Sequence, residues 1–187
     1  MKNNFYNKPI GNVYLKPSLK SEVSTQILYG EKFKILSKTK GWIKIQTKFD
    51  RYSGFIKDGN FMISFKPYYK IFSKKSWIYK KFKSNFRKTK KYLYFSSSIQ
   101  NLDSKKDFIK FDKNSWIKKK DIKKHNHTEK NYKKILKLFL NTKYLWGGKS
   151  ADGIDCSALI QIFFKYNKNF FPRDTKDQIK YCKKNIN

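Results

Sequence analysis

The residues best suited to chemistry lie in one segment near the C-terminus, around Cys156. Gly147 and Gly148 supply a turn before it, and residues 156–164 have the apolar content of a largely buried helix. Asp155 is a good N-cap for that helix. A cysteine in the first turn lies at the positive end of the helix dipole, which favours the nucleophilic thiolate. The pattern predicts a cysteine nucleophile, with a small apolar core residue as the alternative.

Three motifs around this cysteine resemble the NlpC/P60 family of cysteine peptidases. They are Tyr-x-Trp-Gly-Gly from Tyr144, Gly-Ile-Asp-Cys-Ser from Gly153, and Pro-Arg-Asp-Thr from Pro172, followed by Gln178. The resemblance implies a papain-like α+β domain. It also implies a thiol protease that hydrolyses the bond between γ-D-glutamate and a diamino acid, typically diaminopimelate, in peptidoglycan peptides.

By position in these motifs, the resemblance implies roles for five residues. Cys156 matches the nucleophile, and its backbone amide at the helix N-terminus would help to hold the oxyanion. Asp155 and Ser157 match the subsite for an N-terminal L-alanine, where Asp155 would pair with the free amine. Tyr144 would contact the substrate or the oxyanion region, and Thr175 would flank the same pocket.

Several of these residues also have a purely structural interpretation. Tyr144 and Trp146 would then be core aromatics, and Arg173 would only tie down its loop through a carboxylate. Thr175 and Gln178 have the spacing of a capping box for a helix over 175–184. The family more often has glycine where Ala158 stands.

A cysteine nucleophile needs a base and a group that orients the base. In the family these come from strands after the cysteine helix, a histidine first, but no histidine follows Cys156 in this sequence. His125 and His127 lie in a polar stretch that we expect to be a solvated linker. We therefore expect a chain truncated before the catalytic histidine and inactive by itself. The helices predicted over 129–141, 156–166 and 175–184 would lack a sheet partner for apolar residues, namely Leu159, Ile160, Phe163 and Phe164.

The N-terminal part contains short strand patterns separated by turn signals. The expected strands are 24–28, 32–37, 42–47 and 54–57. In the third of them, Ile43 and Ile45 share one face, with Trp42, Lys44 and Gln46 on the other. The order of these runs, with Gly41-Trp42 and Gly54-Phe55, resembles a bacterial SH3 domain, which we place at residues 1–65.

Residues 66–126 are expected to form a second, degenerate SH3-like module and a linker. Strand patterns occur at 92–95, 108–111 and 115–117, and Trp116-Ile117-Lys118 repeats Trp42-Ile43-Lys44. The lysine-rich stretch 74–91 contains Trp77, Tyr79, Phe82 and Phe86. It fits half-buried strands with aromatics inward and lysines outward, and it also fits single-stranded nucleic-acid binding. Residues 127–187, where Thr128 is the expected first N-cap, then form the N-terminal helical part of an α+β NlpC/P60 domain.

The composition is strongly basic, with 45 Lys and Arg against 13 acidic residues and a net charge of +32. Since only three of the 45 are arginine, an AT-rich coding bias explains the charge better than nucleic-acid recognition does. Such a surface would still contact polyanions. The alternatives to a peptidase are a catalytically dead SH3 protein that binds the cell wall and a basic nucleic-acid-binding protein.

Targeting and metal-binding signals are missing from the sequence. The N-terminus has no signal-peptide pattern and no apolar run is long enough for a transmembrane helix, which predicts a cytoplasmic rather than periplasmic or wall location. Cys156 and Cys182 have no metal-ligand spacing with each other or with the histidines. We expect no metal, no cofactor and no disulfide framework.

Overall fold

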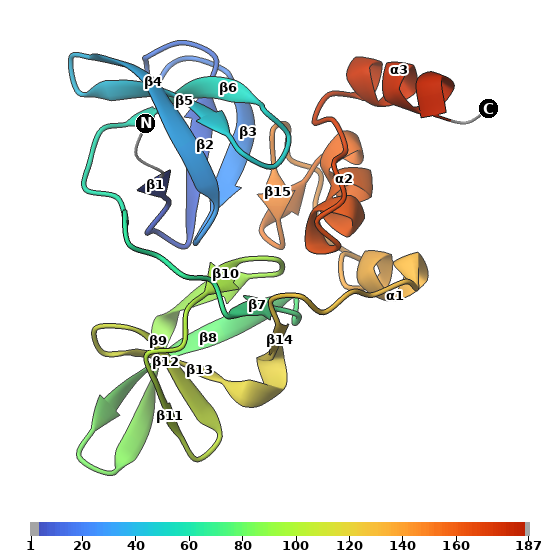
Figure 1. Cartoon of the computed structure of the whole chain (residues 1–187). Helices are drawn as coiled ribbons and strands as arrows, with labels where there is room; N and C mark the ends of the chain where they lie inside the picture. The colour runs from blue at the N-terminus through green and yellow to red at the C-terminus, as the bar shows by residue number, and fades with distance from the viewer. Residues whose placement is uncertain (1–3, 186–187) are drawn as a thin grey trace.

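Alternating apolar side chains build the first part of the chain into a six-stranded antiparallel sheet. The computed structural model describes residues 4–185 (Figure 1). The sheet order is β1-β4-β5-β6-β2-β3. Its strands are β1 (Asn4–Phe5), β2 (Ile10–Tyr14), β3 (Val23–Leu28), β4 (Lys32–Thr39), β5 (Trp42–Thr47) and β6 (Ser53–Lys57). The four strands expected here are confirmed to within two residues at each end, and the sequence did not indicate β1 or β2.

Strand β5 shows why this sheet forms. Ile43 and Ile45 are fully buried, while Lys44 between them is exposed, as the alternation predicts. Trp42 lies on the other face but is only 6% exposed. The edge of Tyr14 and the ammonium of Lys57 cover it, at 5.4 and 4.2 Å between centres. The outer face of the sheet is therefore partly covered as well.

A second β-unit follows, made of two smaller antiparallel sheets. The sheet orders are β10-β7-β14 and β11-β12-β13-β8-β9. The strands are β7 (Tyr69–Ile71), β8 (Lys75–Phe82), β9 (Asn85–Tyr94), β10 (Ser98–Ile99), β11 (Asp103–Lys105), β12 (Phe108–Asp112), β13 (Ser115–Lys118) and β14 (Ile122–Lys124), with a 3-10 turn at Lys119–Asp121. The region is all-β as expected, and the domain boundaries at 65 and 126 stay predictions.

The lysine-rich stretch 74–91 forms the long β8–β9 hairpin, but its aromatics do not point inward. The buried residues of this hairpin include Ser76, Ile78 and Leu93. Trp77 lies on the more open face, and the other aromatic residues of this stretch are half-buried or exposed. The ammonium of Lys88 lies 3.8 Å from the centre of the Trp77 ring. The expected inward aromatics are therefore wrong here, because small and aliphatic side chains already fill the inner face.

The C-terminal part is helical, as predicted. It comprises α1 (Tyr132–Lys137), β15 (Lys149–Ser150), β16 (Gly153–Ile154), α2 (Cys156–Tyr166) and α3 (Thr175–Asn185). The two helices expected over 156–166 and 175–184 are confirmed. None of the helices in the described part of the chain is long and apolar enough to cross a membrane.

The helix expected over 129–141 is wrong in length and in its cap. Only residues 132–137 are α-helical, and Asn131 rather than Thr128 is the N-cap. Glu129 instead donates its backbone N–H to Asn167 at 2.8 Å, which holds it outside the helix. The positive φ of Asn141, 59°, ends the turns that follow. Burial of Ile135 and Phe139 still satisfies the apolar pattern.

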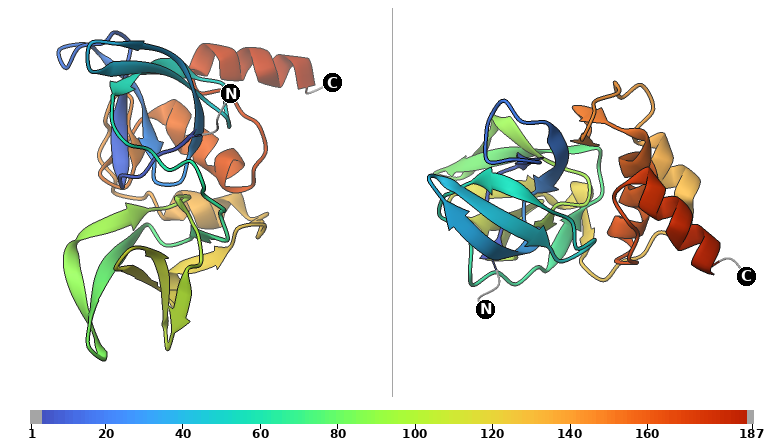
Figure 2. Two further views of the ribbon diagram at one scale, coloured as in Figure 1. Left: turned by 60° about the vertical axis from the view of Figure 1, so that its left-hand side comes forward. Right: turned by 90° about the horizontal axis from the view of Figure 1, so that it is seen from above.

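Figure 2 shows the arrangement of the β-units and the helices from two further sides. Three clusters of buried side chains connect these parts. The first lies inside the first sheet. The second joins both β-units, since Phe5 and Tyr29 of the first unit pack with Ile71 and Phe111 of the second. The third joins Phe95 of the second unit to the helices. The helices are thus packed against a single β-rich body.

The apolar face of α2 is less open than expected. Ile160 is 44% exposed, but Leu159 and Phe163 pack on the third cluster. Phe164 stacks on Phe171 with ring centroids 4.2 Å apart. The loop after α2 folds back and supplies part of the cover that the sequence pattern did not reveal.

Candidate active site

The N-terminus of α2 presents Cys156 to solvent. Asp155 has extended backbone angles and accepts a hydrogen bond from the backbone N–H of Ala158 at 2.8 Å, so the predicted N-cap is confirmed. Ala158 is fully buried, and Ser157 is 7% exposed. Cys156 is a free, exposed thiol. The alternative that it is a core residue is therefore wrong.

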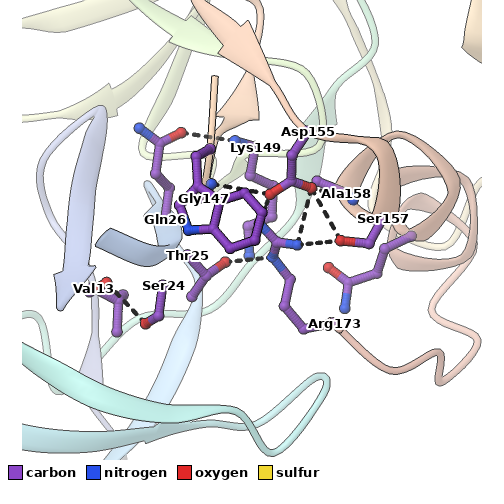
Figure 3. A network of polar contacts seen from close by, with 12 residues as sticks. Val13, Ser24, Thr25, Gln26, Gly147, Lys149, Asp155, Ser157, Ala158 and Arg173 are labelled. Atoms are coloured by element: carbon purple, nitrogen blue, oxygen red, sulfur yellow. Dashed lines mark hydrogen bonds and ion pairs between the residues drawn. The ribbon is translucent and has the colours of Figure 1, made fainter. Parts of the chain in front are cut away.

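A buried ion pair fixes this helix end (Figure 3). Arg173 places Nη2 2.6 Å from Asp155 Oδ2 and Nη1 3.0 Å from Oδ1. The same guanidinium donates to Ser157 Oγ at 2.7 Å and, through Nε, to Thr25 Oγ1 at 2.7 Å. Because Thr25 belongs to β3, Arg173 connects the first sheet to the cysteine helix. The expected tie to a carboxylate is confirmed, and Asp155 is its partner.

The carboxylate of Asp155 is fully used by protein donors. Besides Arg173 and Ala158, it accepts from Ser157 Oγ and from the backbone N–H of Gly147, each at 3.1 Å. The residue is 6% exposed. Its predicted pairing with a substrate amine stays a prediction, and an amine would have to share oxygens that already serve four residues.

The segment before the helix is pressed onto the first sheet. Gly147 has a φ of +70°, and a Cβ there would lie 2.2 Å from the carbonyl oxygen of Val23. Only glycine fits this close approach. Two residues later, the backbone N–H of Lys149 donates a hydrogen bond to the side-chain oxygen of Gln26 at 2.8 Å. The glycine turn predicted from sequence therefore serves as a docking point for β3.

Tyr144 and Trp146 lie on the surface at this site. They are 63% and 62% exposed, so the interpretation as core aromatics is wrong. The indole N–H of Trp146 donates to Glu22 Oε1 at 2.6 Å. Both aromatic rings are thus available at the side of Cys156.

A cavity of about 400 Å³ contains the predicted site residues. It is lined by Leu15, Glu22, Ser24, Tyr52, Tyr144, Trp146, Asp155, Cys156, Ser157, Arg173, Asp174, Thr175 and Lys176. All five residues chosen from the sequence therefore face one space. Glu22, Ser24 and Tyr52 were missed, because they belong to the first β-unit and no local pattern relates them to Cys156.

Helix α3 is anchored to the same helix end. Thr175 is its first residue, is exposed and lines the cavity. The side-chain amide of Gln178 donates to the carbonyl oxygens of Ser157 and Pro172, both at 2.9 Å. Gln178 therefore does not complete the expected capping box. It ties α3 to α2 instead.

Asp174, like Glu22, is an acidic residue that lines the cavity and was not selected from the sequence. Burial raises the pKa of Asp174, and the nearby Asp177 acts in the same direction. Burial also raises the pKa of Tyr52, with the charge of Asp174 as the next cause. The cavity thus contains two carboxylates besides that of Asp155, namely those of Glu22 and Asp174.

The two histidines lie at the opposite end of α2. His127 Nδ1 is 2.9 Å from the hydroxyl of Tyr166, the last residue of the helix. An eleven-residue helix is about 16 Å long, so this contact lies far from Cys156. Both rings are half-buried, so the expected solvated linker pair is wrong. No histidine is among the described residues that line the Cys156 cavity.

Metal ligands do not gather in the part of the chain that the structure describes. Within residues 4–185, no group of three or more His, Cys, Asp or Glu side chains is arranged to hold a metal ion. The groups that line the cavity are a thiol, three carboxylates, one guanidinium, one ammonium, hydroxyls and aromatic rings.

Buried polar contacts hold the first sheet against α2 below the cavity. Gln161 donates to Asp50 at 2.9 Å, and Glu31 pairs with Lys165 at 2.9 Å and with Lys149 at 3.6 Å. Although burial acts to raise it, the pKa of Asp50 is lowered by Lys149 and by hydrogen bonds. Burial lowers the pKa of Lys149, against the opposing effect of Glu31. These charges are compensated only while the parts stay together.

Two family models match the chain. The model of the bacterial dipeptidyl-peptidase SH3 domain matches residues 13–60, and the NlpC/P60 family model matches residues 141–187. The γ-D-glutamyl-L-lysine dipeptidyl-peptidase of Bacillus subtilis (strain 168) is 49% identical over 43 residues. That match covers 23% of this chain and 14% of the relative, so the similarity spans a small part of the relative's length.

A solved structure supports the arrangement of the whole fold. An NlpC/P60 family protein from Bacillus cereus ATCC 10987 superimposes with a TM-score of 0.79 over 95% of this chain and 76% of its own, at 14% identity. The predicted fold class, SH3-like β-structure followed by part of a papain-like α+β domain, is thereby confirmed. The second SH3-like module at residues 66–126 stays a prediction. Residues 13–60 are thus similar to bacterial SH3 domains and residues 141–187 to NlpC/P60 domains, so the chain carries sequences related to those of cell-wall peptidases.

Proposed function

We propose that Cys156 is the nucleophile of a peptidase that cleaves the bond between γ-D-glutamate and a diamino acid in peptidoglycan peptides. The observation that supports this most is the exposed thiol at the N-terminus of a buried helix, within a cavity of about 400 Å³. Tyr144, Ser157 and Thr175 line the same cavity and form the surroundings of the substrate.

The chemistry starts with attack of the Cys156 thiolate on the γ-glutamyl carbonyl carbon. The carbonyl electrons move to oxygen, and the backbone N–H groups at the helix N-terminus stabilise that oxyanion. Collapse expels the amine of the diamino acid, which takes up a proton, and leaves a thioester on Cys156. Water then hydrolyses the thioester. The proton transfers need a base beyond the described residues of the cavity.

In this proposal, the first β-unit makes the site prefer substrates that have a free N-terminal amine. Glu22 and Asp174 are the cavity's other carboxylates, whereas that of Asp155 is held by Arg173. A carboxylate that lines the cavity attracts the ammonium of an N-terminal L-alanine. The same unit narrows the groove, so short peptides enter more easily than intact wall. Cleavage of short free peptides is the activity expected of a cytoplasmic enzyme.

Protection of Cys156 from alkylation tests binding without requiring turnover. We expect L-Ala-γ-D-Glu-diaminopimelate to slow the reaction of Cys156 with iodoacetamide at least tenfold, as followed by peptide mass spectrometry. Cys182, a half-buried free thiol on α3, serves as the internal control and should react at an unchanged rate. Equal protection by the N-acetylated peptide would contradict selection of a free amine, and no protection by either would overturn the site.

A wall-binding protein without catalysis is the second candidate, favoured by the net charge of +32. It predicts that Cys156→Ala binds purified sacculi as well as the wild type does, while the tripeptide protects no thiol. The peptidase proposal predicts instead that the protein binds the free tripeptide in preference to sacculi.

A further inference from the structure

A second cavity of about 400 Å³ lies at the other end of α2, where the two β-units and the helices meet. It shares no lining residue with the Cys156 cavity. The loops of the first unit, the strands of the second and the segment after Tyr166 each contribute to its wall. The lining residues that carry polar or charged groups are Glu31, Lys32, Lys48, Lys70, Ser96, Ser98, His125, Lys165, Tyr166 and Lys168.

The charges around this cavity are unbalanced. Five lysines line it against a single carboxylate, Glu31. That carboxylate is already paired with Lys165 at 2.9 Å and lies 3.6 Å from the fully buried Lys149. Within the described chain, the ammonium groups of Lys48 and Lys168 have no carboxylate within ion-pair distance. Both residues are exposed and line the cavity.

One of the five lysines is buried, which makes the imbalance costly. Lys70 is 3% exposed, and its ammonium donates to the Tyr166 carbonyl oxygen at 2.5 Å and lies 3.8 Å from the centre of the Tyr166 ring. Burial lowers the pKa of Lys70 to about 8, and Lys168 and Lys165 add to the effect. Burial and the same three lysines lower the pKa of His125 to about 4.

Hydrogen-bond donors surround the same space. His125 Nε2 lies 3.4 Å from the Ser98 hydroxyl, and its Nδ1 lies 3.1 Å from the Lys168 ammonium. A tetrahedral dianion matches this set, because it neutralises several ammonium groups and accepts bonds from hydroxyl and ring N–H groups together. The volume exceeds that of inorganic phosphate and leaves room for an esterified sugar or polyol.

We propose that this cavity binds a phosphate group, free or as a phosphate ester, and thereby holds the three parts of the molecule together. The site goes beyond the proposed peptidase function and does not depend on it. A bound phosphate would bridge Lys48 of the first unit and Lys168 of the helical part across Ser98 and His125 of the second. Binding to the assembled state alone stabilises that state.

The test compares two double variants with equal charge changes. In Lys48→Gln/Lys168→Gln the two exposed ammonium groups are removed, and Lys106→Gln/Lys113→Gln is the control. Lys106 and Lys113 are exposed and distant from the cavity, and Lys106 and Lys168 both have positive φ, 46° and 61°. The two variants thus differ chiefly in where the charge is lost.

We expect inorganic phosphate at ten times its Kd to raise the Tm of the wild type and of the control variant by about 3–6 °C. In Lys48→Gln/Lys168→Gln the calorimetrically measured Kd should rise at least tenfold. Glycerol 3-phosphate distinguishes the sources, because tighter binding than inorganic phosphate identifies an ester as the ligand. Equal responses of both variants, or an equal Tm shift with sodium chloride at the same ionic strength, would overturn the proposal.

Discussion

Trp146 donates its indole N–H to Glu22 Oε1 over 2.6 Å, a contact between residues 124 positions apart in the chain. The tryptophan belongs to the segment that leads to Cys156, and the glutamate precedes strand β3 of the first sheet. One wall of the thiol cavity is therefore made by the SH3-like unit, so that wall and the thiol come from separate parts of the sequence.

This contact leads to a prediction for Glu22→Gln. The glutamine amide oxygen can still accept the hydrogen bond from Trp146. The substitution removes the negative charge that would attract a free amine. We expect the Kd for L-Ala-γ-D-Glu-diaminopimelate, measured by titration calorimetry, to rise about tenfold. Binding of the N-acetylated peptide should not change. An equal loss for both peptides would assign Glu22 a structural role only.

The buried pair of Arg173 and Asp155 predicts a large stability loss on truncation. Arg173→Ala leaves the Asp155 carboxylate, 8% exposed in its side chain, without its cation. We expect the free energy of unfolding in urea to fall by about 3–5 kcal/mol. The control is Lys38→Ala, which removes the exposed ion pair with Asp58 and should cost less than about 1 kcal/mol. Similar costs for the two variants would contradict the burial argument.

Gly147→Ala and Gly41→Ala separate backbone strain from a steric clash. Both glycines have similar positive φ, +70° and +76°, but a Cβ at Gly41 meets nothing within 4 Å. Gly41→Ala should cost about 1 kcal/mol of unfolding free energy. Gly147→Ala should cost at least about 2 kcal/mol, since its Cβ would overlap the Val23 carbonyl. Equal melting temperatures would mean that the segment is not pressed onto β3.

His125 predicts a pH dependence of stability. Its pKa is about 4 in the folded protein against 6.5 for a free side chain, because of burial first and then Lys168, Lys70 and Lys165. Since the unfolded chain takes up a proton below pH 6.5 and the folded protein does so only near pH 4, this stability is present above 6.5 and lost between 6.5 and 4. After allowance for the half-exposed ring, the loss is about 1–2 kcal/mol.

The comparison with His125→Gln isolates that contribution. Wild type and variant are unfolded in urea at pH 7 and at pH 4.5, and the wild type should lose more stability between the two. Parallel losses would show that other groups, and not His125, cause the acid sensitivity.

The sequence allowed prediction of the parts whose pattern is local. Strand β5 alternates, Asp155 caps the helix that follows, and the motifs around Cys156 place five residues that do line one cavity. In each case the determining interactions lie within a few residues.

Other features depended on contacts between distant segments. Glu22 and Tyr52 enter the cavity because β3 and the β5–β6 connection pack against the Cys156 segment, which no short window records. The helix expected over 129–141 was shortened by Asn167, which binds Glu129 from 38 positions away. The aromatics of the β8–β9 hairpin were misplaced because Ile78 and Leu93 fill its inner face.

The β8–β9 hairpin has a practical consequence. Its turn, between Phe82 and Asn85, contributes no residue to the Cys156 cavity or to the lysine-lined cavity, and Figure 1 shows the hairpin extending away from the helices. An affinity tag inserted between Lys83 and Ser84 would therefore immobilise the protein through the middle of its chain. The point of attachment would then belong to neither cavity, and neither terminus would be used.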